Sequence, residues 1–166
     1  MPTTAVDFKT HIKDVPDFPS PGILFRDIQP LLSNPKVYQQ AIDELVAISE
    51  PADYYVGIDS RGFLFASSMA LKTNAGIILL RKKGKLPPPT IAQEYSLEYG
   101  TDTLEIQPGT GRVVIVDDVY ATGGTMDAAE ILCKKAGYTV VDRVVLIDLE
   151  FLHGPNDVKS LVQYNG

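Results

Sequence analysis

The sequence is poor in the residues that build disulfide frameworks and metal sites. Among 166 residues there is one cysteine, Cys133, and there are only two histidines, His11 and His153. One cysteine cannot form an internal disulfide, and two histidines are too few for a histidine-rich metal site. Cys133 lies in an amphipathic run, which favours a buried core thiol over a reactive one. Neither histidine falls in a recognisable motif, so we expect both at the surface.

The chain also lacks long apolar runs and an excess of positive charge. No segment approaches the ~20 apolar residues of a membrane-spanning helix, and the first thirteen residues hold no apolar core of a signal peptide. The net charge of −6 disfavours a protein that wraps DNA or RNA. With 45% hydrophobic and 22% charged residues, the length fits one globular domain. We expect a cytoplasmic protein with neither a membrane nor a nucleic-acid partner.

Short runs that are apolar on both faces alternate along the chain with helical patterns. The expected strands cover residues 54–58, 76–80, 112–116 and 140–149, and the expected helices cover residues 35–49, 63–72 and 126–136. Strands of this kind, separated by helices, are typical of a parallel sheet covered on two sides. The predicted fold class is therefore α/β, with a mostly parallel central sheet flanked by helices.

Other stretches fit this pattern less well. A short helix is expected over residues 8–12, and prolines from Pro16 onward predict an extended connector after it. Residues 82–93 contain three consecutive prolines and fit no regular element. Residues 95–99 and 103–106 are expected to pair as a hairpin.

The most informative segment runs from Val113 to Thr125. Four apolar residues lead to the paired acids Asp117 and Asp118, and a short loop then joins them to the expected helix over residues 126–136. This glycine loop consists of Ala121, Thr122, Gly123, Gly124 and Thr125. Ligands of open α/β sheets bind at the carboxyl ends of strands, where a helix N-terminus offers unpaired N–H groups to a phosphate. The segment therefore predicts a phosphate site.

The acid pair limits the kinds of ligand that this segment would bind. The loop has neither the Gly-Lys-Ser/Thr of a Walker A motif nor the spacing of a dinucleotide-binding GxGxxG motif. Because carboxylates repel a phosphate, Asp117 and Asp118 should serve another part of the ligand. The vicinal hydroxyls of a ribose 5-phosphate can donate to both acids. A capped turn beside a solvated acid pair is the alternative.

A second strand-to-helix junction lies at Asp59-Ser60-Arg61-Gly62. Arg61 and the backbone of Gly62 would sit at a helix start, which is a favourable position for an anion. An ordinary capped helix with a surface arginine is the alternative. A basic cluster follows the next expected strand and contains Arg81, Lys82 and Lys85. In an acidic protein this cluster favours an anion site over a solvated patch, and fixed cations can stabilise a pyrophosphate leaving group.

The segment from Val113 to Thr125 resembles the motif that binds phosphoribosyl pyrophosphate (PRPP) in type I phosphoribosyltransferases. That motif has four apolar residues, two acids and a Thr-Gly-Gly-Thr-like loop. The resemblance implies that the glycine loop holds the 5′-phosphate, and that Asp117 and Asp118 hold the ribose hydroxyls. The string Asp59–Phe63 is similar to the pyrophosphate loop of adenine phosphoribosyltransferases, in which the peptide before the serine is typically cis. The implied pyrophosphate-binding residues are Asp59, Ser60, Arg61, Arg81, Lys82 and Lys85.

The string Leu97-Glu98-Tyr99-Gly100 is similar to part of the catalytic loop of adenine phosphoribosyltransferases. In that family the matching glutamate handles a proton of adenine. The resemblance implies that Glu98 is catalytic and that it lies with Tyr99 in a mobile lid over about residues 82–100. By composition alone, Glu98 would be a solvated strand residue.

The N-terminal segment Phe18–Ile28 is similar to the base-binding segment of the same family. The resemblance implies that Phe25 stacks on the purine, while backbone groups around Leu24 and Arg26 read its edge. Adenine presents a donor at N6 and an acceptor at N1, whereas hypoxanthine presents the reverse. A fixed donor and acceptor would therefore reject the wrong purine.

The resemblance extends from about Phe18 to Leu149, with these motifs in the family's order. It implies transfer of a phosphoribosyl group from PRPP to adenine, giving AMP and pyrophosphate in purine salvage, through an oxocarbenium-like transition state. The implied catalytic residues are Glu98, Asp117, Asp118 and Arg61. It also implies a homodimer and Mg²⁺ bound with PRPP, although no metal site made of protein ligands alone is recognisable. The expected single domain has an N-terminal base-binding hood over residues 1–33, a catalytic core over 34–150 and a C-terminal tail over 151–166.

Two alternatives stay open. The base could be xanthine, hypoxanthine or orotate, although the Leu-Glu-Tyr-Gly and Phe-Arg-Asp strings argue against these bases. The chain could also be a regulator that senses PRPP or a purine without catalysis. The acidic charge and the lack of an added DNA-binding domain argue against that function.

Overall fold

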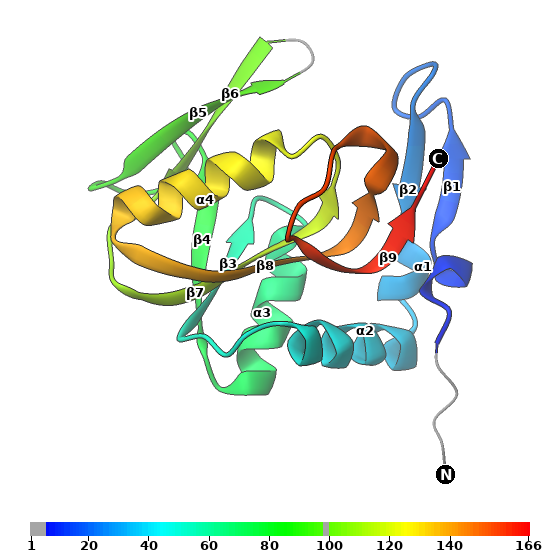
Figure 1. The fold of residues 1–166 in the computed structure, drawn as a ribbon, viewed down its shortest axis with the longest axis horizontal. Coiled ribbons are helices and arrows are strands. Elements are labelled where there is room, and N and C mark those ends of the chain that lie inside the picture. The colour runs from blue at the N-terminus through cyan, green and yellow to red at the C-terminus, as the bar shows by residue number, and fades with distance from the viewer. Residues whose placement is uncertain (1–5, 98–99) are drawn as a thin grey trace. The chain divides into compact units, whose positions relative to one another are not determined.

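The computed structural model describes residues 6–97 and 100–166. The chain forms two compact units, Met1–Glu44 and Leu45–Gly166. Figure 1 labels the helices and strands of both units along the chain.

The first unit contains a short antiparallel hairpin. η1 (Phe8–His11) leads into β1 (Lys13–Pro16), which pairs with β2 (Leu24–Asp27). The turn between the strands is closed by Asp17, whose Oδ1 accepts a hydrogen bond from the Gly22 N–H at 2.9 Å. The expectation of an extended connector missed this pairing. Prolines fix φ near a value that an edge strand accepts, so they do not exclude a hairpin.

Two helices follow the hairpin. α1 (Gln29–Leu32) is short, and α2 (Pro35–Ile48) crosses from the first unit into the second. The side chain of Asn34 accepts a hydrogen bond from the Val37 N–H at 3.3 Å. Pro35, at the first helical position, has no N–H and therefore leaves no donor without a partner. These two residues explain why the helix begins where the sequence predicted.

Within the described residues, the second unit is built around a seven-stranded sheet in the order β5-β6-β4-β3-β7-β8-β9. The strands are β3 (Tyr54–Ile58), β4 (Gly76–Lys82), β5 (Ile91–Leu97), β6 (Gly100–Ile106), β7 (Gly111–Tyr120), β8 (Tyr138–Leu149) and β9 (Lys159–Tyr164). Neighbouring strands from β4 to β9 are parallel, whereas β6 runs antiparallel to β4 and to β5. This topology confirms the predicted α/β class with a mostly parallel sheet.

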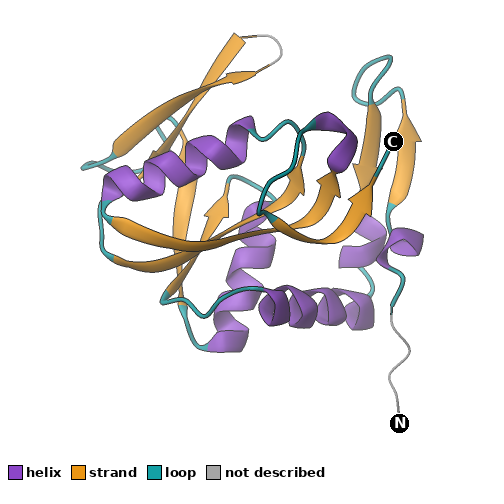
Figure 2. Ribbon diagram, viewed as in Figure 1, coloured by secondary structure: helices purple, strands orange, loops and turns teal. Residues whose placement is uncertain are grey.

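Two helices cover the sheet. Figure 2 shows α3 (Gly62–Thr73) on one face and α4 (Gly124–Ala136) on the other. α4 ends at Gly137, which has a φ of +112° and closes the helix as a left-handed cap residue. A short 3-10 helix, η2 (Glu150–Leu152), joins β8 to the tail. None of the helices in the described part of the chain is long and apolar enough to cross a membrane.

The centre of the core is the first half of β7. The residues from Val113 to Val116 are completely buried. Because helices cover both faces of the sheet, every position in this stretch must be apolar, and the continuous apolar run predicted the strand for that reason. Cys133 on α4 is also completely buried, and burial raises the pKa of its thiol to about 12. The prediction of a core thiol is confirmed.

Parts of the sheet differ from expectation. β7 continues to Tyr120, so the acid pair lies within the strand instead of after it. β4 reaches Lys82 and β5 begins at Ile91, because pairing with β6 extends both strands into a stretch that was expected to be irregular. β9 was not predicted. It pairs with β8 through backbone hydrogen bonds, and of its side chains only Val162 is fully buried, so its sequence carries a weak strand pattern.

Candidate functional site

Two strand-to-helix junctions meet at the carboxyl edge of the sheet. β3 and β7 are parallel neighbours, so the segments that follow them emerge side by side. One segment leads through Arg61 into α3, and the other leads through the glycine loop into α4. Together with side chains from β4, β5 and β6 they line a cavity of about 340 Å³. The lining residues are Ile58, Asp59, Ser60, Arg61, Lys82, Tyr95, Leu97, Asp102, Asp117, Asp118 and Thr125.

The acid pair forms one wall of this cavity. The Asp118 carboxylate is buried, and its Oδ2 lies 3.0 Å from Arg61 Nε. This oxygen accepts no hydrogen bond among the described residues. The Asp118 N–H donates to Asp117 Oδ1 at 2.8 Å. Burial and the neighbouring Asp118 carboxylate hold the pKa of Asp117 well above its usual range. The wall therefore offers an acceptor oxygen to a hydroxyl donor.

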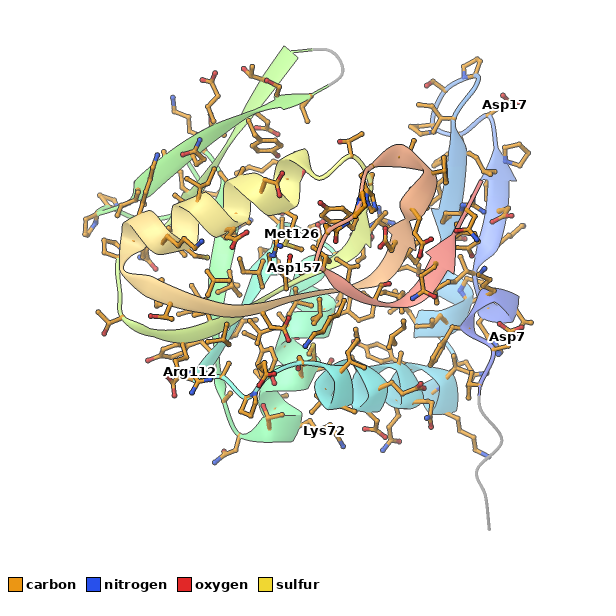
Figure 3. The ribbon with its side chains drawn as sticks, viewed as in Figure 1. Asp7, Asp17, Lys72, Arg112, Met126 and Asp157 are labelled. Atoms are coloured by element: carbon orange, nitrogen blue, oxygen red, sulfur yellow. The ribbon has the colours of Figure 1, made fainter. Side chains whose placement is uncertain are left out.

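The glycine loop opens α4. Gly123 is the N-cap residue and has a φ of +98°, which glycine adopts without strain. A Cβ at this position would lie 2.7 Å from the Tyr120 hydroxyl oxygen. The loop lines a small cavity of about 80 Å³ that also contacts Met126 at the start of α4 (Figure 3). A helix N-terminus with a concave backbone is suited to an anion such as phosphate.

Two further cations lie beside acids near the cavity. Arg81 Nε is 3.5 Å from Asp59 Oδ2, and Lys82 Nζ is 3.0 Å from Asp102 Oδ2. The hydrogen bond between Lys82 and Asp102 raises the pKa of the lysine and lowers the pKa of the aspartate. Both partners are therefore charged at neutral pH, and the cation is held at the cavity wall.

Among the other residues expected to bind pyrophosphate, Asp59, Ser60 and Arg61 line the cavity, whereas Lys85 does not. The peptide between Asp59 and Ser60 is cis, as in the family that the sequence resembles. Arg61 is the N-cap residue of α3, at the helix start that the sequence predicted. Lys85 is exposed and is not among the residues that line the cavity in the described part of the chain, although its backbone N–H donates to the Lys82 carbonyl oxygen at 3.3 Å.

This geometry agrees with comparisons to known proteins. The family described as phosphoribosyl transferase domain matches residues 31–157. The adenine phosphoribosyltransferase of Bdellovibrio bacteriovorus is 50% identical over 165 residues, which cover 96% of this chain and 100% of that protein. This chain belongs to the adenine phosphoribosyltransferase family. The family member from Rhodospirillum rubrum is 48% identical over 170 residues, covering 96% of this chain and 99% of that protein.

A solved structure of the family extends this likeness to three dimensions. The adenine phosphoribosyltransferase from Thermoanaerobacter pseudethanolicus matches with a TM-score of 0.88 at 39% identity, covering 95% of this chain and 98% of that chain. Membership of the adenine phosphoribosyltransferase family confirms the resemblance drawn from the motifs, and it confirms the fold class.

The expected base-binding residues lie in the first unit, on β2. The Phe25 ring meets Phe18 edge to face, with centroids 5.2 Å apart. Arg26 is buried, and its Nη1 lies 2.8 Å from Asp14 Oδ1. Leu24 is largely exposed. Packing thus fixes the side chains of Phe25 and Arg26.

The lid residues Glu98 and Tyr99 lie outside the described residues. Their flanking positions are described: Leu97 lines the cavity and pairs with Gly100 at the end of the β5–β6 hairpin. Glu98 therefore directly follows, in the sequence, a residue that lines the cavity.

Sequence reasoning missed several polar residues of this region. Tyr95 and Asp102 are cross-strand partners in the β5–β6 hairpin, and both line the cavity. Burial and the Asp102 carboxylate raise the pKa of Tyr95. The predicted hairpin around Gly100 could have revealed this pair, because it fixes which residues face each other.

The expectation that both histidines lie at the surface was wrong for His153. Its side chain is 9% exposed, and its Nε2 lies 2.5 Å from Asp148 Oδ1. The Asp148 side chain is equally buried. Nothing in the sequence near His153 marks this contact, because the partners are five positions apart and the 3-10 helix η2 lies between them. His11, in the first unit, is half-buried.

Proposed function

We propose that this chain transfers the phosphoribosyl group of PRPP to adenine, giving AMP and pyrophosphate. The observation that carries the proposal is the acid pair near the end of β7, which precedes the glycine loop in the chain and whose Asp118 carboxylate lies 3.0 Å from Arg61. Neither the Walker A loop nor the dinucleotide-binding GxGxxG loop has a pair of acids directly before its glycines as part of its pattern. The printed names of the relatives, adenine phosphoribosyltransferase, support adenine as the acceptor.

The acid pair would hold the ribose. The Oδ2 of Asp118 accepts no hydrogen bond among the described residues and can accept one from a ribose hydroxyl, and Asp117 adds a second carboxyl beside it. When the bond to pyrophosphate breaks, positive charge develops on the sugar. Carboxylates beneath that charge stabilise the oxocarbenium-like transition state more than they stabilise the substrate. The glycine loop would fix the other end of the sugar through its 5′-phosphate.

Cations that line the same cavity, or lie beside it, would take up the charge of the leaving group. Arg61 and Lys82 line the same cavity as the acid pair, and Arg81 lies next to Asp59, which also lines it. Ser60 and the α3 N-terminus add neutral donors there. Lys85 would join this set only if its exposed stretch moves when substrate binds.

A magnesium ion would enter with PRPP. The described residues contain no group of three or more His, Cys, Asp or Glu side chains that could hold a metal ion. The ion would therefore take most of its ligands from the diphosphate and ribose oxygens, as Mg²⁺ does in many phosphate sites. When bound, it would neutralise charge on the pyrophosphate. The acidic side chains of the cavity wall, Asp59 and Asp102, can hydrogen-bond to its water shell.

Adenine would bind to residues of which the structure describes some and not others. We propose that Phe25 stacks on adenine and that the backbone at Leu24 and Arg26 reads its edge. The fixed side chains of Phe25 and Arg26 support this role, because a rigid surface discriminates between purines better than a mobile one. Glu98 would accept the proton that adenine loses, and Tyr99 would belong to the same lid. Closure of the lid would exclude water from the cationic sugar.

A homodimer is part of this proposal. Large apolar side chains are exposed on α3 and β4, and Leu71 has 85% of its surface exposed. The others on these two elements are Leu64, Ile77 and Leu79. Such a group of exposed apolar residues is suited to an interface with a second copy of the chain.

A turnover assay with adenine, PRPP and Mg²⁺ tests the proposal. We expect equimolar AMP and pyrophosphate. We also expect a preference of at least ~10²-fold in kcat/KM for adenine over hypoxanthine, because the wrong purine leaves buried polar groups unpaired. Xanthine and orotate serve as further competitors. Equal turnover of hypoxanthine would refute the choice of base, and no turnover with any base would refute the reaction.

A further inference from the structure

A histidine–aspartate pair lies next to Tyr120, the residue that precedes the glycine loop. His153, in the tail, places Nε2 2.5 Å from Asp148 Oδ1 at the end of β8. Its Nδ1 lies 2.6 Å from the Gly154 carbonyl oxygen. The Asn156 Nδ2 also lies 2.9 Å from Nδ1, and it donates to the Gly154 carbonyl oxygen at 3.2 Å. With Asn156 donating to that carbonyl, an acceptor oxygen remains at each ring nitrogen of His153. The doubly protonated imidazolium can donate to both oxygens, whereas a neutral ring can donate to only one.

The same imidazole ring packs against Tyr120. The two ring centroids are 4.6 Å apart, with an angle of 85° between the planes. This is an edge-to-face contact, and a protonated imidazole whose edge points at the face of the tyrosine ring is attracted to it more strongly than a neutral one. Tyr120 is buried and is the last residue of β7 before the glycine loop.

Tyr120 in turn supports the glycine loop. Its hydroxyl group covers Gly123 so closely that a Cβ there would lie 2.7 Å from the hydroxyl oxygen. Tyr120 and Gly123 also line the same small cavity as the rest of the loop. A movement of the Tyr120 ring would therefore remove the support of Gly123 and change the conformation of the loop.

We propose that His153 is a positioning residue for the glycine loop: its imidazolium, held by Asp148, keeps Tyr120 against Gly123 in the conformation that binds a phosphate monoester. This inference rests on the proposed function, because it concerns the loop to which that function assigns the 5′-phosphate. His153 touches neither the loop nor the main cavity in this arrangement, and it acts through Tyr120.

The charges around His153 favour its protonated form. The hydrogen bond to the Gly154 carbonyl and the hydrogen bond to Asp148 raise the pKa of His153 above its usual value. The groups that face the ring or share its cavity of about 890 Å³ are Asp148, Glu150, Asn156, Lys159 and Tyr120. Further charges near Tyr120 are Asp127, Arg143 and Asp157, the last labelled in Figure 3. Burial raises the pKa of Tyr120, so its hydroxyl stays neutral while His153 titrates.

The direction of the pH effect follows from this pKa. The imidazolium is fully present below the ordinary histidine pKa of about 6.5, and it is lost as the pH rises through the raised value in the folded protein. Support of the loop should therefore weaken on the alkaline side. A lysine at position 153 would keep a cation up to about pH 10, and an asparagine would carry none at any pH.

The experiment measures binding of ribose 5-phosphate to the full chain by calorimetry between pH 5.5 and 9. The proteins are wild type, His153→Lys, His153→Asn and a control, His11→Asn, at the other histidine of the sequence. Because the phosphate of the ligand also titrates, each variant is compared with wild type at the same pH. We expect His153→Asn to bind about fivefold more weakly than wild type at pH 6, the size of one cation–π contact, and to bind equally at pH 9. His153→Lys should match wild type at pH 6 and bind more tightly at pH 9, and His11→Asn should match it throughout.

A purely structural role predicts a different result. His153→Asn would then lower the melting temperature while its affinity for ribose 5-phosphate equals that of wild type at every pH, and this result would overturn the inference. If the His153 variants do not fold, the Tyr120→Phe variant provides the test. This variant keeps the ring contact with His153 but removes the hydroxyl group over Gly123. An unchanged affinity for ribose 5-phosphate and an unchanged KM for PRPP would refute the coupling. AMP formation with unchanged binding in His153→Asn would overturn only the inference. The expected binding pattern without AMP formation would refute only the proposed function.

Discussion

Replacement of Asp117 by asparagine should make the ligand-free protein more stable at neutral pH. Asp117 is half-buried beside Asp118, with the Asp118 N–H donating to its Oδ1 at 2.8 Å. Burial, followed by repulsion from the Asp118 carboxylate, raises the pKa of Asp117 well above its usual range. The folded protein therefore binds this proton more tightly than the unfolded chain does. Asparagine removes the charge but can still accept the Asp118 N–H.

The sign and size of the effect follow from linkage between proton binding and folding. A carboxyl group with a raised pKa contributes stability below its unfolded pKa of about 3.9, and that contribution is lost as the pH rises towards the folded value. Each pKa unit of elevation corresponds to about 1.4 kcal/mol. For a domain of this size, 1 kcal/mol shifts the melting temperature by roughly 2–4 °C. The Asp117→Asn protein should therefore melt higher at pH 7 by about 3–6 °C for each such unit.

Thermal denaturation followed by circular dichroism, without ligand, between pH 4 and pH 8 tests this reasoning. The difference between Asp117→Asn and wild type should be small at pH 4 and should grow as the pH rises. Asp118→Asn is the matched control, because the Asp118 carboxylate lies 3.0 Å from Arg61 and its loss should destabilise the fold. A lower melting temperature for Asp117→Asn at pH 7, or a difference that does not depend on pH, would show that Asp117 is a stabilising carboxylate and would refute the argument.

Two further predictions concern turnover. Asp118→Asn should fold yet lose about 10²–10⁴-fold in kcat, the range for one preorganised catalytic group, and near wild-type kcat in the folded variant would remove Asp118 from the ribose site. Glu98→Gln keeps the shape of the side chain but cannot accept a proton, so single-turnover rates with adenine should fall by roughly 10²-fold or more while PRPP affinity changes little. A rate equal to wild type would mean that water or another group takes the proton of adenine.

The parts of the fold that the sequence predicted are those in which local pattern and burial coincide. Residues 113–116 are completely buried on both faces of the sheet, and the sequence shows this as four consecutive apolar residues. β9 and the β1–β2 hairpin were missed for the same physical reason. Their strands are held by backbone pairing with a partner, and their side chains are mostly exposed or half-buried, so no local apolar pattern marks them.

The residues of the candidate site also fall into two groups, those that a local motif predicted and those that it did not. Asp117, Asp118 and the glycine loop are contiguous, so a single motif contains them. Tyr95 and Asp102 reach the cavity only because the register of the β5–β6 hairpin pairs them and the antiparallel contact of β6 with β4 places that pair beside Lys82. The contact between His153 and Tyr120 joins two segments that are distant in the sequence. Long-range register of this kind is set by tertiary packing and is not encoded in any local spacing.

Under the proposed function, the pairing of cations with acids would allow an acidic protein to select PRPP. Arg61 lies 3.0 Å from Asp118, and Lys82 lies 3.0 Å from Asp102, so each cation is held in place and neutralised before substrate arrives. Arginine has five N–H donors and lysine has three, so each can keep its acid and still bind a phosphate oxygen.

An entering anion must therefore match the directions of the donors that remain. The net charge of −6 repels polyanions in general, and the buried Asp118 oxygen favours only a ligand that brings a hydroxyl donor to it. Free pyrophosphate satisfies the cations but not this oxygen, and ribose satisfies the oxygen but not the cations. PRPP carries both groups on one molecule, so in the proposed function the same acids that weaken binding of simple anions would give the site its selectivity.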